Sequence, residues 1–581
     1  MKKYIYILIF ILIASSCFDN LDKQPDFISE NLVFEDQNLT EAYIADLYER
    51  LNFQTSTDVF MGIRGAAGAE YTGFGNWQPA NGVATRQYIA ETGPGNLDRW
   101  LYTPIRDMNF LLEEIESSTT FSQEYITMKK AEVRFLRAFA YFEMVKTFGG
   151  VPLVLRVQDI NEPIENLRVS RDKEEDVYDY IFNELEDILN DYSENKTGAN
   201  GRADRYAVLM LQSRAMLYAA SIARNGSVEL DGVVGIPSSR QNEFFERSYN
   251  ASKEIIDSGL FQLYDQNPDR VQNYRNIFLD EGNDEIIFAE IFEPFIKGHD
   301  WDFMAFPAGF NATWNSNWTV MYDFVELFDF TDGRSGKIER SQFTNQNLWD
   351  IDDFFGNRDP RFRASVFYPE TEFQGRKVFF HSNTVYFENG ERRVSTQEAQ
   401  NFQTLNGEIF PGAAPQRNRI RSGFQLRKRV DDSNTLPQAA NSGQDYVIFR
   451  YAETLLNYAE AAYYLNRAGE SLDAINQIRE RVGMPLHTQL DEEKIRNERQ
   501  VELCFEDHRY YDLVRWRIAH EVLSVRTAGM VYSYHLDEDK YAITLNNAEN
   551  LERVFEPRRY YLPFGLNRLA ENPNLVQNPG F

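Results

Sequence analysis

Aromatic side chains alternate with amides in two stretches of the chain. The stretch 301–318 has no helical or strand period and holds three of the seven tryptophans. The stretch 70–88 lies in a Gly- and Ala-rich region with few helix signals, and it adds an arginine. A flat ring covers the apolar face of a sugar at a small cost in side-chain entropy. Amides and guanidinium groups hydrogen-bond to hydroxyls. The composition therefore predicts two loops that bind a glycan.

The predicted ligand-binding residues come from these two loops. We favour Trp77, Trp314 and Trp318 as binding residues, because polar neighbours flank them. For any one ring the alternative is that it packs in the core of a helix-poor region. Trp100 and Trp516 are expected in the core. The complete set of predicted ligand-binding residues is Tyr71, Phe74, Trp77, Asn81, Arg86, Trp301, Phe306, Trp314, Asn315, Asn317 and Trp318.

A second group of residues that could carry out chemistry lies between 498 and 515, where ionisable side chains are dense. Arg499 with Glu502, and Arg509 with Asp512, have the three-residue spacing of ion pairs on one helix. A catalytic interpretation would make Glu502 and Glu506 an acid/base pair. We favour the other interpretation, a buried ion network that locks helices together.

The sequence lacks the spacings that metal, nucleotide and hydrolase sites require. It has no HExxH, CxxC, Walker or GxSxG pattern. Asp329, Asp332 and Gly333 lie close together without the alternating ligand spacing of an EF-hand. We therefore expect no cofactor, no metal and no catalytic residue.

Length and charge narrow the class of protein further. A chain of 581 residues exceeds the ~250–300 residues at which one core stops growing, which predicts several domains or a stacked architecture. The 60 basic and 89 acidic residues give a net charge of −29. A nucleic acid partner requires a basic patch, and no run of lysine and arginine in the chain supplies one. We therefore exclude a nucleic acid partner.

The N-terminus has the three parts of a signal peptide. Two lysines precede an apolar run at 4–13, and small residues at 14–16 lead to Cys17. An apolar run of this length is too short to span ~30 Å of hydrocarbon. The cysteine at the cleavage point is similar to a bacterial lipoprotein signal, which implies lipidation of Cys17. A plain secretory signal is the alternative.

Helical periodicity recurs on both sides of an irregular middle region. Apolar residues have helical spacing in the segments 40–51, 101–115, 124–148, 172–193, 203–224, 243–258, 447–466, 471–481 and 491–507. The spacing of the first helices is that of helix pairs without a strict repeat, which indicates an α-solenoid. Residues 265–445 are loop-rich, with short strands such as 285–288.

Several segments together resemble the SusD/RagB family of nutrient-binding lipoproteins from Bacteroidetes outer membranes. They occur in the family's order along nearly the whole chain, at 131–154, 201–220, 357–362, 449–485, 495–516 and 560–581. The departures are small: Phe564-Gly565 stands where the family often has Ile-Pro, and Cys504 stands where it has a small or apolar residue.

The resemblance implies a mainly α fold, with a tetratricopeptide-like helix-pair scaffold (an α-α superhelix) and a large irregular loop-rich subdomain. The expected domains are a signal peptide at 1–16, a lipidated tether at 17–38, an N-terminal helical region at 39–264, an irregular ligand-binding subdomain at 265–445 and a C-terminal helical region at 446–581.

The resemblance also implies a function. Family members are not enzymes; they bind glycans, or in some branches peptides, at the cell surface and pass them to a SusC-like TonB-dependent transporter. We therefore expect an oligosaccharide ligand, a transporter partner and a lipid anchor, here palmitate on Cys17, in the outer membrane. The alternatives are a peptide-binding member of the family, a surface glycoside hydrolase and a scaffold that binds only proteins.

Overall fold

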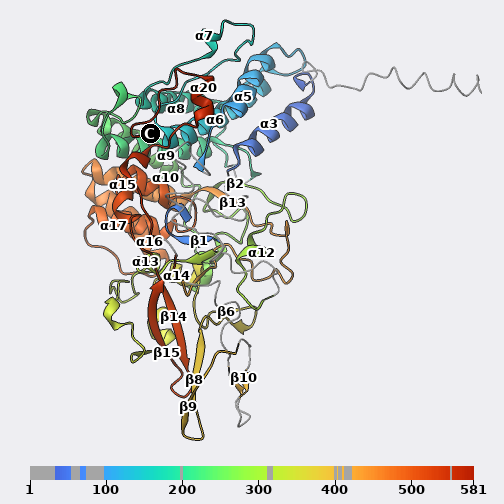
Figure 1. Cartoon of the computed structure of the whole chain (residues 1–581). Coiled ribbons are helices and arrows are strands. Elements are labelled where there is room, and N and C mark those ends of the chain that lie inside the picture. The colour runs from blue at the N-terminus through green and yellow to red at the C-terminus, as the bar shows by residue number, and fades with distance from the viewer. Residues whose placement is uncertain are drawn as a thin grey trace, which may run out of the picture.

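The computed structural model describes most of the chain after residue 32. The described residues are 33–53, 66–73, 97–196, 200–310, 318–397, 402–403, 409–410, 422–549 and 552–581. Helices fill one end of the molecule and the largest sheet projects from the other (Figure 1).

The helical end begins with six helices that the periodicity predicted to within a few residues. They are α3 (Gln37–Leu51), α5 (Tyr102–Glu114), α6 (Gln123–Phe148), α8 (Glu174–Ile188), α9 (Arg205–Asn225) and α10 (Gln241–Ser258). The first of these helices begins at Gln37, three residues before the predicted segment. Asp36 caps α3 through its carboxylate, while the Thr40 hydroxyl donates to the carbonyl of Val33.

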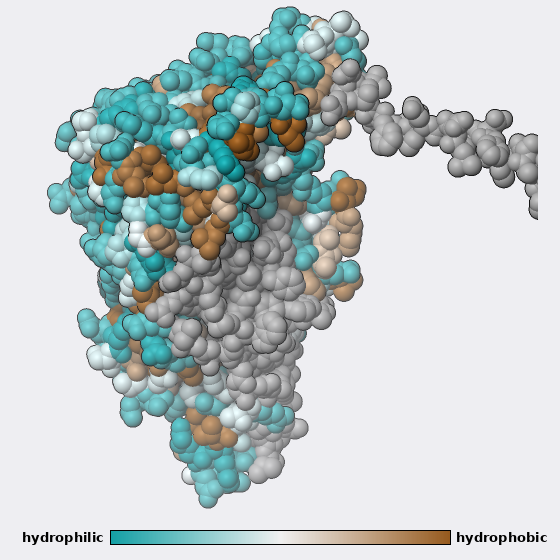
Figure 2. Space-filling view, turned by 45° about the horizontal axis from the view of Figure 1, so that its top comes forward, coloured by the Kyte–Doolittle hydropathy of each residue, from teal (hydrophilic) through white to brown (hydrophobic). Residues whose placement is uncertain are grey.

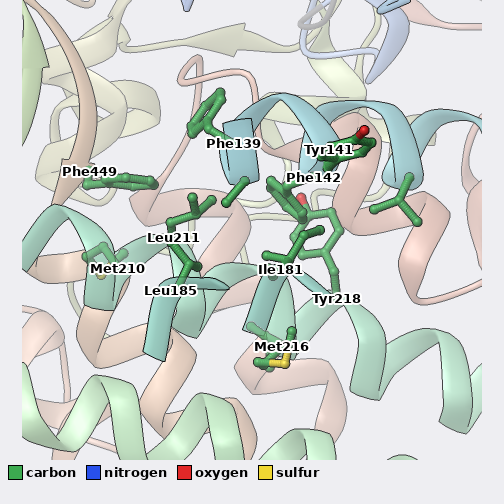
Figure 3. Close-up of a cluster of buried hydrophobic side chains, with 14 of the residues drawn as sticks. Phe139, Tyr141, Phe142, Ile181, Leu185, Met210, Leu211, Met216, Tyr218 and Phe449 are labelled. Carbon is green, nitrogen blue, oxygen red and sulfur yellow. The ribbon is translucent and has the colours of Figure 1, made fainter. Parts of the chain in front are cut away.

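Helix α6 is buried on almost every side, as its apolar composition predicted. It ends where Gly149 adopts a φ of 77°, which favours glycine. Figure 3 shows aromatic and aliphatic side chains of α6, α8 and α9 packed together with Phe449. Each such side chain stabilises the fold by about 1.5–3 kcal/mol when fully buried.

Four further helices continue the stack. They are α15 (Tyr451–Tyr464), α16 (Ala468–Arg481), α17 (Glu492–Glu502) and α18 (Arg509–Arg515). Helix α9 packs between α8 and α10, α10 packs on α15, and α15 packs on α16. The predicted scaffold of helix pairs is confirmed.

Two predicted helix boundaries were wrong near these helices. Residues expected at the start of α15 form strand β13 (Tyr446–Arg450), which pairs with β2 (Ile286–Glu290). Helix α17 ends at Glu502 rather than near 507, because Phe505 and Asp507 have φ values of 60° and 64°. A right-handed helix does not accommodate those values.

The largest sheet has five strands in the order β4-β15-β14-β8-β9. Its long hairpin, β14 (Ala528–His535) and β15 (Lys540–Asn547), is antiparallel, and β14 runs parallel to β8 (Asn383–Glu388). The flanking strands are β9 (Glu391–Ser395) and β4 (Leu348–Trp349). These strands form the lower end of the molecule in Figure 1.

The remaining elements are short and lie mostly between α10 and α15. They are β1 (Tyr71–Gly73), α7 (Ile164–Leu167), α11 (Arg270–Asn276), α12 (Trp301–Ala305), β3 (Trp318–Val320), α13 (Tyr322–Val325), α14 (Pro360–Ser365), β5 (Val366–Phe367), β6 (Glu372–Phe373), β7 (Arg376–Lys377), β10 (Phe402–Gln403), β11 (Ile409–Phe410), β12 (Gln425–Leu426), α19 (Ala519–Val522) and α20 (Leu566–Glu571).

This loop-rich part has its own core, in which aromatic rings form a larger share of the buried side chains than in the core of the helical end. Phe355, Phe362 and Tyr368 stack at its centre, with ring centroids 5.1–5.7 Å apart. Phe424 packs edge-on against Phe355. These rings stabilise a region that has little regular secondary structure.

The outer surface of the helical end is mostly hydrophilic, with scattered hydrophobic patches (Figure 2). Within the described residues, the structure contains no helix that is both long and apolar enough to cross a bilayer.

Candidate ligand-binding site

The two predicted ligand loops start from one short strand pair. Strands β1 and β3 are antiparallel, and their register sets Tyr71 opposite Val320 and Gly73 opposite Trp318. The chain leaves the pair at Gly73 toward residues 74–96, and it re-enters at Trp318 from residues 311–317. Two stretches that are more than 200 residues apart in sequence are therefore joined at their ends by a hydrogen-bonded ladder.

The segment that leads into β1 is tied to the C-terminal half by arginines and backbone groups. Arg553 Nη1 donates to the carbonyl of Ala66 at 2.7 Å, and Arg509 Nε donates to the carbonyl of Gly68 at 2.8 Å. The backbone N–H of Met321 donates to the carbonyl of Glu70 at 3.1 Å. These bonds fix the base of the first loop to the same frame as the second.

Glu70 lies in this base with its side chain fully buried. Its Oε1 accepts a hydrogen bond from the backbone N–H of Phe505 at 2.8 Å, and its Oε2 has no hydrogen-bond partner among the described residues. Burial raises the pKa of Glu70 to about 8, because it outweighs that hydrogen bond and the nearby charges of Arg509 and Lys428. The carboxyl is therefore mostly protonated at neutral pH.

Four of the residues predicted to bind ligand on an exposed aromatic surface are buried, so the prediction is wrong for them. Tyr71, Trp301, Phe306 and Trp318 are 3%, 5%, 0% and 1% exposed. The Trp301 and Trp318 rings lie 4.6 Å apart, and Trp301 Nε1 donates to the carbonyl of Lys428. These rings pack in the aromatic core, because a region poor in helices has few aliphatic faces to bury instead.

The other predicted residues lie outside the described residues and stay predictions. They are Cys17, Phe74, Trp77, Asn81, Arg86, Trp314, Asn315 and Asn317.

The two tryptophans predicted to be structural are packed in the helical core. Trp516 is buried, and its Nε1 donates to Glu460 at 2.9 Å. Trp100 packs against Phe148 and Phe564 at 5.6 and 5.4 Å.

Arg429 is a residue near the site that the sequence did not single out. Its guanidinium is buried and lies 4.6 Å from the ring of Trp301 and 5.1 Å from the ring of Tyr446. Within the part of the chain that the structure describes, its Nε and Nη2 have no hydrogen-bond partner. It belongs to a short basic run at 427–429, and nothing in that run distinguishes it from its neighbours.

A small polar pocket of about 40 Å³ adjoins Tyr446 on the side of the helices. Phe53 and Tyr511 line it together with charged groups such as Lys146 and Asp507. The volume of this pocket is too small for a sugar ring, so the pocket does not itself hold the proposed ligand.

The dense charges at 498–515 form a buried ion network, which the second interpretation predicted. Glu502 accepts from Arg450 at 2.7 Å, from Arg361 at 3.0 Å and from Arg481. Burial acts to raise the pKa of Glu502, but the charges of the three arginines outweigh it and hold the pKa well below its usual value. A carboxylate held in that state is unsuited to act as a general acid.

The predicted partners within this network were wrong. Arg499 pairs with Asp512 at 2.9 Å instead of Glu502, and Arg515 also bonds to Asp512. Arg509 bonds to the carbonyl of Gly68 instead of Asp512. Each predicted pair lies within one helix, α17 or α18, but its members bond to groups from other segments, so the three-residue spacing does not determine the pairs.

The described residues contain no cluster of His, Cys, Asp or Glu side chains arranged to hold a metal ion. Asp329 and Asp332 form interactions with residues close to them in sequence. Asp329 accepts from the backbone N–H of Gly336, and Asp332 pairs with Arg334.

Two family models match the chain. The model of the SusD family matches residues 284–581, just over half of the sequence. The chain belongs to the SusD/RagB family. A second model, "Starch-binding associating with outer membrane", matches residues 19–217.

Curated relatives of this SusD-family chain align over most of its length. A SusD-like protein from Bacteroides ovatus is 23% identical over 87% of this chain and 80% of the relative. The starch-binding protein SusD from Bacteroides thetaiotaomicron is 23% identical over 76% of this chain and 74% of the relative.

Solved structures share the fold. A SusD-like protein from Bacteroides fragilis superposes with a TM-score of 0.73 at 22% identity, over 95% of this chain and 99% of that one. A SusD-like carbohydrate-binding protein from the same species has a TM-score of 0.68 at 20% identity, over 94% and 100% of the two chains.

Proposed function

We propose that this protein is a cell-surface glycan-binding lipoprotein. It captures an oligosaccharide and passes it to a SusC-like TonB-dependent transporter by binding and release, without bond chemistry. Membership of the SusD/RagB family and the starch- and carbohydrate-binding names of its relatives support a glycan ligand.

The observation that carries the proposal is the ladder between β1 and β3. The two loops richest in aromatics and amides are joined at Gly73 and Trp318, on a base that Arg509 and Arg553 hold in place. A rigid base lowers the entropy cost of ordering two loops around one ligand. With four rings assigned to the core, the proposed contacts are those of Trp77 and Trp314.

Binding to a panel of neutral and acidic polysaccharides, measured by affinity electrophoresis and then by calorimetry, tests the proposal. We expect Trp77→Ala and Trp314→Ala each to weaken binding at least tenfold, which corresponds to about 1.4 kcal/mol. Phe387→Ala is the matched control, because Phe387 is an exposed ring on β8 and 51% of it is accessible.

The outcome also separates the alternatives. If the pure protein binds no glycan and binds peptides instead, the peptide-binding alternative replaces the proposal. If it shortens a bound oligosaccharide, it is a hydrolase. If it binds neither glycan nor peptide and only other proteins, the scaffold alternative is correct.

The anchor and the transporter are tested in cells. We expect a palmitate analogue to label the wild-type protein and not Cys17→Ser, and we expect Cys17→Ser to leave the membrane fraction. A tagged wild-type protein purified in detergent should bring down a TonB-dependent barrel. Recovery of the protein without a barrel would contradict the proposed transfer of ligand.

A further inference from the structure

A second pocket lies between α3, β2 and the turn at residues 200–202. Its volume is about 180 Å³, and Ala45 and Tyr48 of α3 line one wall. Phe288 and Glu290 of β2 line the opposite wall. At ~30 Å³ for each water of the liquid, the space exceeds what one or two ordered waters need, and it suits a single ring.

The floor of this pocket is aromatic. Tyr48, Phe53 and Phe288 contact one another, with ring centroids 5.7–6.4 Å apart. The turn closes one side through Gly201, which has a φ of 76° and approaches Ile291 so closely that a Cβ would lie 2.8 Å from its Cγ1. The pocket therefore combines an apolar floor with fixed walls.

The rim is polar, and its charges are already paired. Arg202 bonds to Glu132 at 3.0 Å and to Glu41. Lys297 bonds to Glu49 at 2.9 Å and to Glu290 at 3.0 Å.

Three cations, Arg202, Lys297 and the neighbouring Lys129, pair with these four carboxylates, and only Arg202, Lys297 and Glu290 among them line the pocket. A charged ligand would have to displace an existing ion pair. Because every carboxylate already has a cationic partner, an amine gains little there. Hydroxyl groups, which both donate and accept, suit alternating guanidinium, ammonium and carboxylate groups.

A chain of mostly buried side-chain contacts fixes the position of this pocket relative to the loop base, so that both belong to one frame. Phe53 lines both the 180 Å³ pocket and the small polar pocket, and Tyr446 lines the small pocket. The Arg429 guanidinium lies over the rings of both Tyr446 and Trp301, and Trp301 touches Trp318. In Figure 1, the elements α3, β2, β13 and α12 follow one another from the helical end toward the middle.

We infer that the pocket between α3 and β2 is a second subsite that takes one neutral sugar ring of a longer glycan. This inference rests on the proposed function and adds to it both a position and a ligand class. It means that the bound glycan extends from the loops toward the helical end, and that its residue in this pocket is uncharged.

Ala45→Trp tests the subsite, because Ala45 is exposed at the pocket wall and a large ring there fills the space. The probes are maltoheptaose, laminarihexaose, cellohexaose and a chitosan hexamer, each compared with its disaccharide by calorimetry. We expect Ala45→Trp to lower the affinity for the long chain relative to the disaccharide at least fivefold. Asn200→Ala, on the rim, should lower it about threefold.

Ala42→Trp is the matched control. Ala42 is exposed on the same helix, one turn earlier, and it does not line the pocket. Helical side chains tilt toward the N-terminus of their helix, so a ring at 42 points away from the pocket. We expect its affinities to equal those of the wild type, with an unchanged melting temperature in both tryptophan variants.

Each outcome decides between the two proposals. If the wild type binds long chains and Ala45→Trp binds them equally well, the subsite is wrong and the proposed function stands. If the wild type binds neither these oligosaccharides nor any polysaccharide of the panel, both fail. If Ala45→Trp weakens only a chitosan hexamer, whose rings carry amines, the pocket is an amine site and the inference is wrong.

Discussion

At the scale of single residues, Glu502 shows how an ionised carboxylate is kept inside a core. Its side chain is inaccessible to solvent, and arginines from β13, α14 and α16 surround it. Desolvation opposes such a cluster, and the gain in charge interaction offsets it only while every partner is present. The cluster is therefore sensitive to the loss of any one member.

We expect Glu502→Gln to lower the free energy of unfolding by about 3–5 kcal/mol, because it leaves three buried arginines short of a counter-charge. Urea unfolding at neutral pH measures this change. Glu493→Gln lies on the same helix at an exposed position and should stay within about 0.5 kcal/mol of the wild type. Equal losses in the two variants would contradict a special role for the network.

Glu70 predicts a dependence of stability on pH. Its pKa is about 8 in the folded protein and near 4.5 when exposed, so between these values the folded state holds a proton that the unfolded state has lost. The free energy of unfolding therefore falls as pH rises from about 4.5 to about 8, by roughly 1.4 kcal/mol for each unit of pH. Above pH 8 this contribution changes no further.

Glu70→Gln mimics the protonated carboxyl and should remove this part of the pH dependence. Urea unfolding of both proteins at pH 5, 6, 7 and 8 gives the comparison, because other groups titrate equally in the two. We expect the variant to gain stability over the wild type steadily across this range. A constant difference between the two proteins would show that Glu70 is ionised when folded.

At the scale of elements, helix caps decide where the periodic segments begin. The carboxylate of Asp204 accepts from the backbone N–H groups of Tyr206 and Ala207, both at 2.9 Å, and it is buried. Asp36 caps α3 in the same way at an exposed position. Both are ordinary N-cap interactions, and they differ only in burial.

We expect Asp204→Ala to lower the free energy of unfolding by about 2 kcal/mol or more, and Asp36→Ala by about 0.5–1 kcal/mol. Water replaces the lost acceptor at Asp36 and cannot reach the N–H groups at Asp204. Circular dichroism during thermal unfolding measures both variants. A larger loss for Asp36→Ala would mean that burial does not set the cost.

The elements also show how much of this fold could be predicted from sequence. Periodicity located α8 and α10, because one buried face fixes the spacing of their apolar residues, while α6 and α9 were located by long apolar segments that are buried on almost every side. It missed the start of α15, where pairing of β13 with β2 overrides a helical pattern, and the end of α17, where positive φ values at Phe505 and Asp507 stop the helix.

The candidate site was predicted only in part, for a related reason. The amino-acid composition of a segment indicates what its rings could bind. It does not indicate which other part of the chain covers those rings in the folded protein. Trp318 lies beside amides in sequence and is nevertheless buried by Trp301 and Tyr71, whose contacts depend on the pairing of two distant segments. The position of Arg429 depends on the same tertiary contacts.

At the scale of the whole molecule, the ion network joins two cores. Arg450 precedes α15 in the helical core, and Arg361 belongs to α14 in the aromatic core. Both donate to Glu502. The coupling between the two halves of the fold therefore runs partly through one carboxylate.

We expect Arg361→Met to weaken this coupling, so that calorimetry resolves two melting transitions where the wild type shows one. Arg363→Met is the control on the same helix, because Arg363 is only partly buried and donates to the carbonyl of Gly356. One transition in Arg361→Met, merely shifted to lower temperature, would show that apolar contacts alone couple the cores.

The ladder between β1 and β3 has a consequence for how relatives of this protein diverge. Residues 74–96 follow β1 and residues 311–317 precede β3, while the ladder itself is built by residues outside both stretches, so a change of length in either one leaves its register intact. Lengthening such a stretch destabilises the fold only slightly, since each doubling of its length adds about 0.6 kcal/mol to the entropic free energy of loop closure. New nutrient preferences can thus arise by exchange of two inserts while the inherited scaffold stays the same.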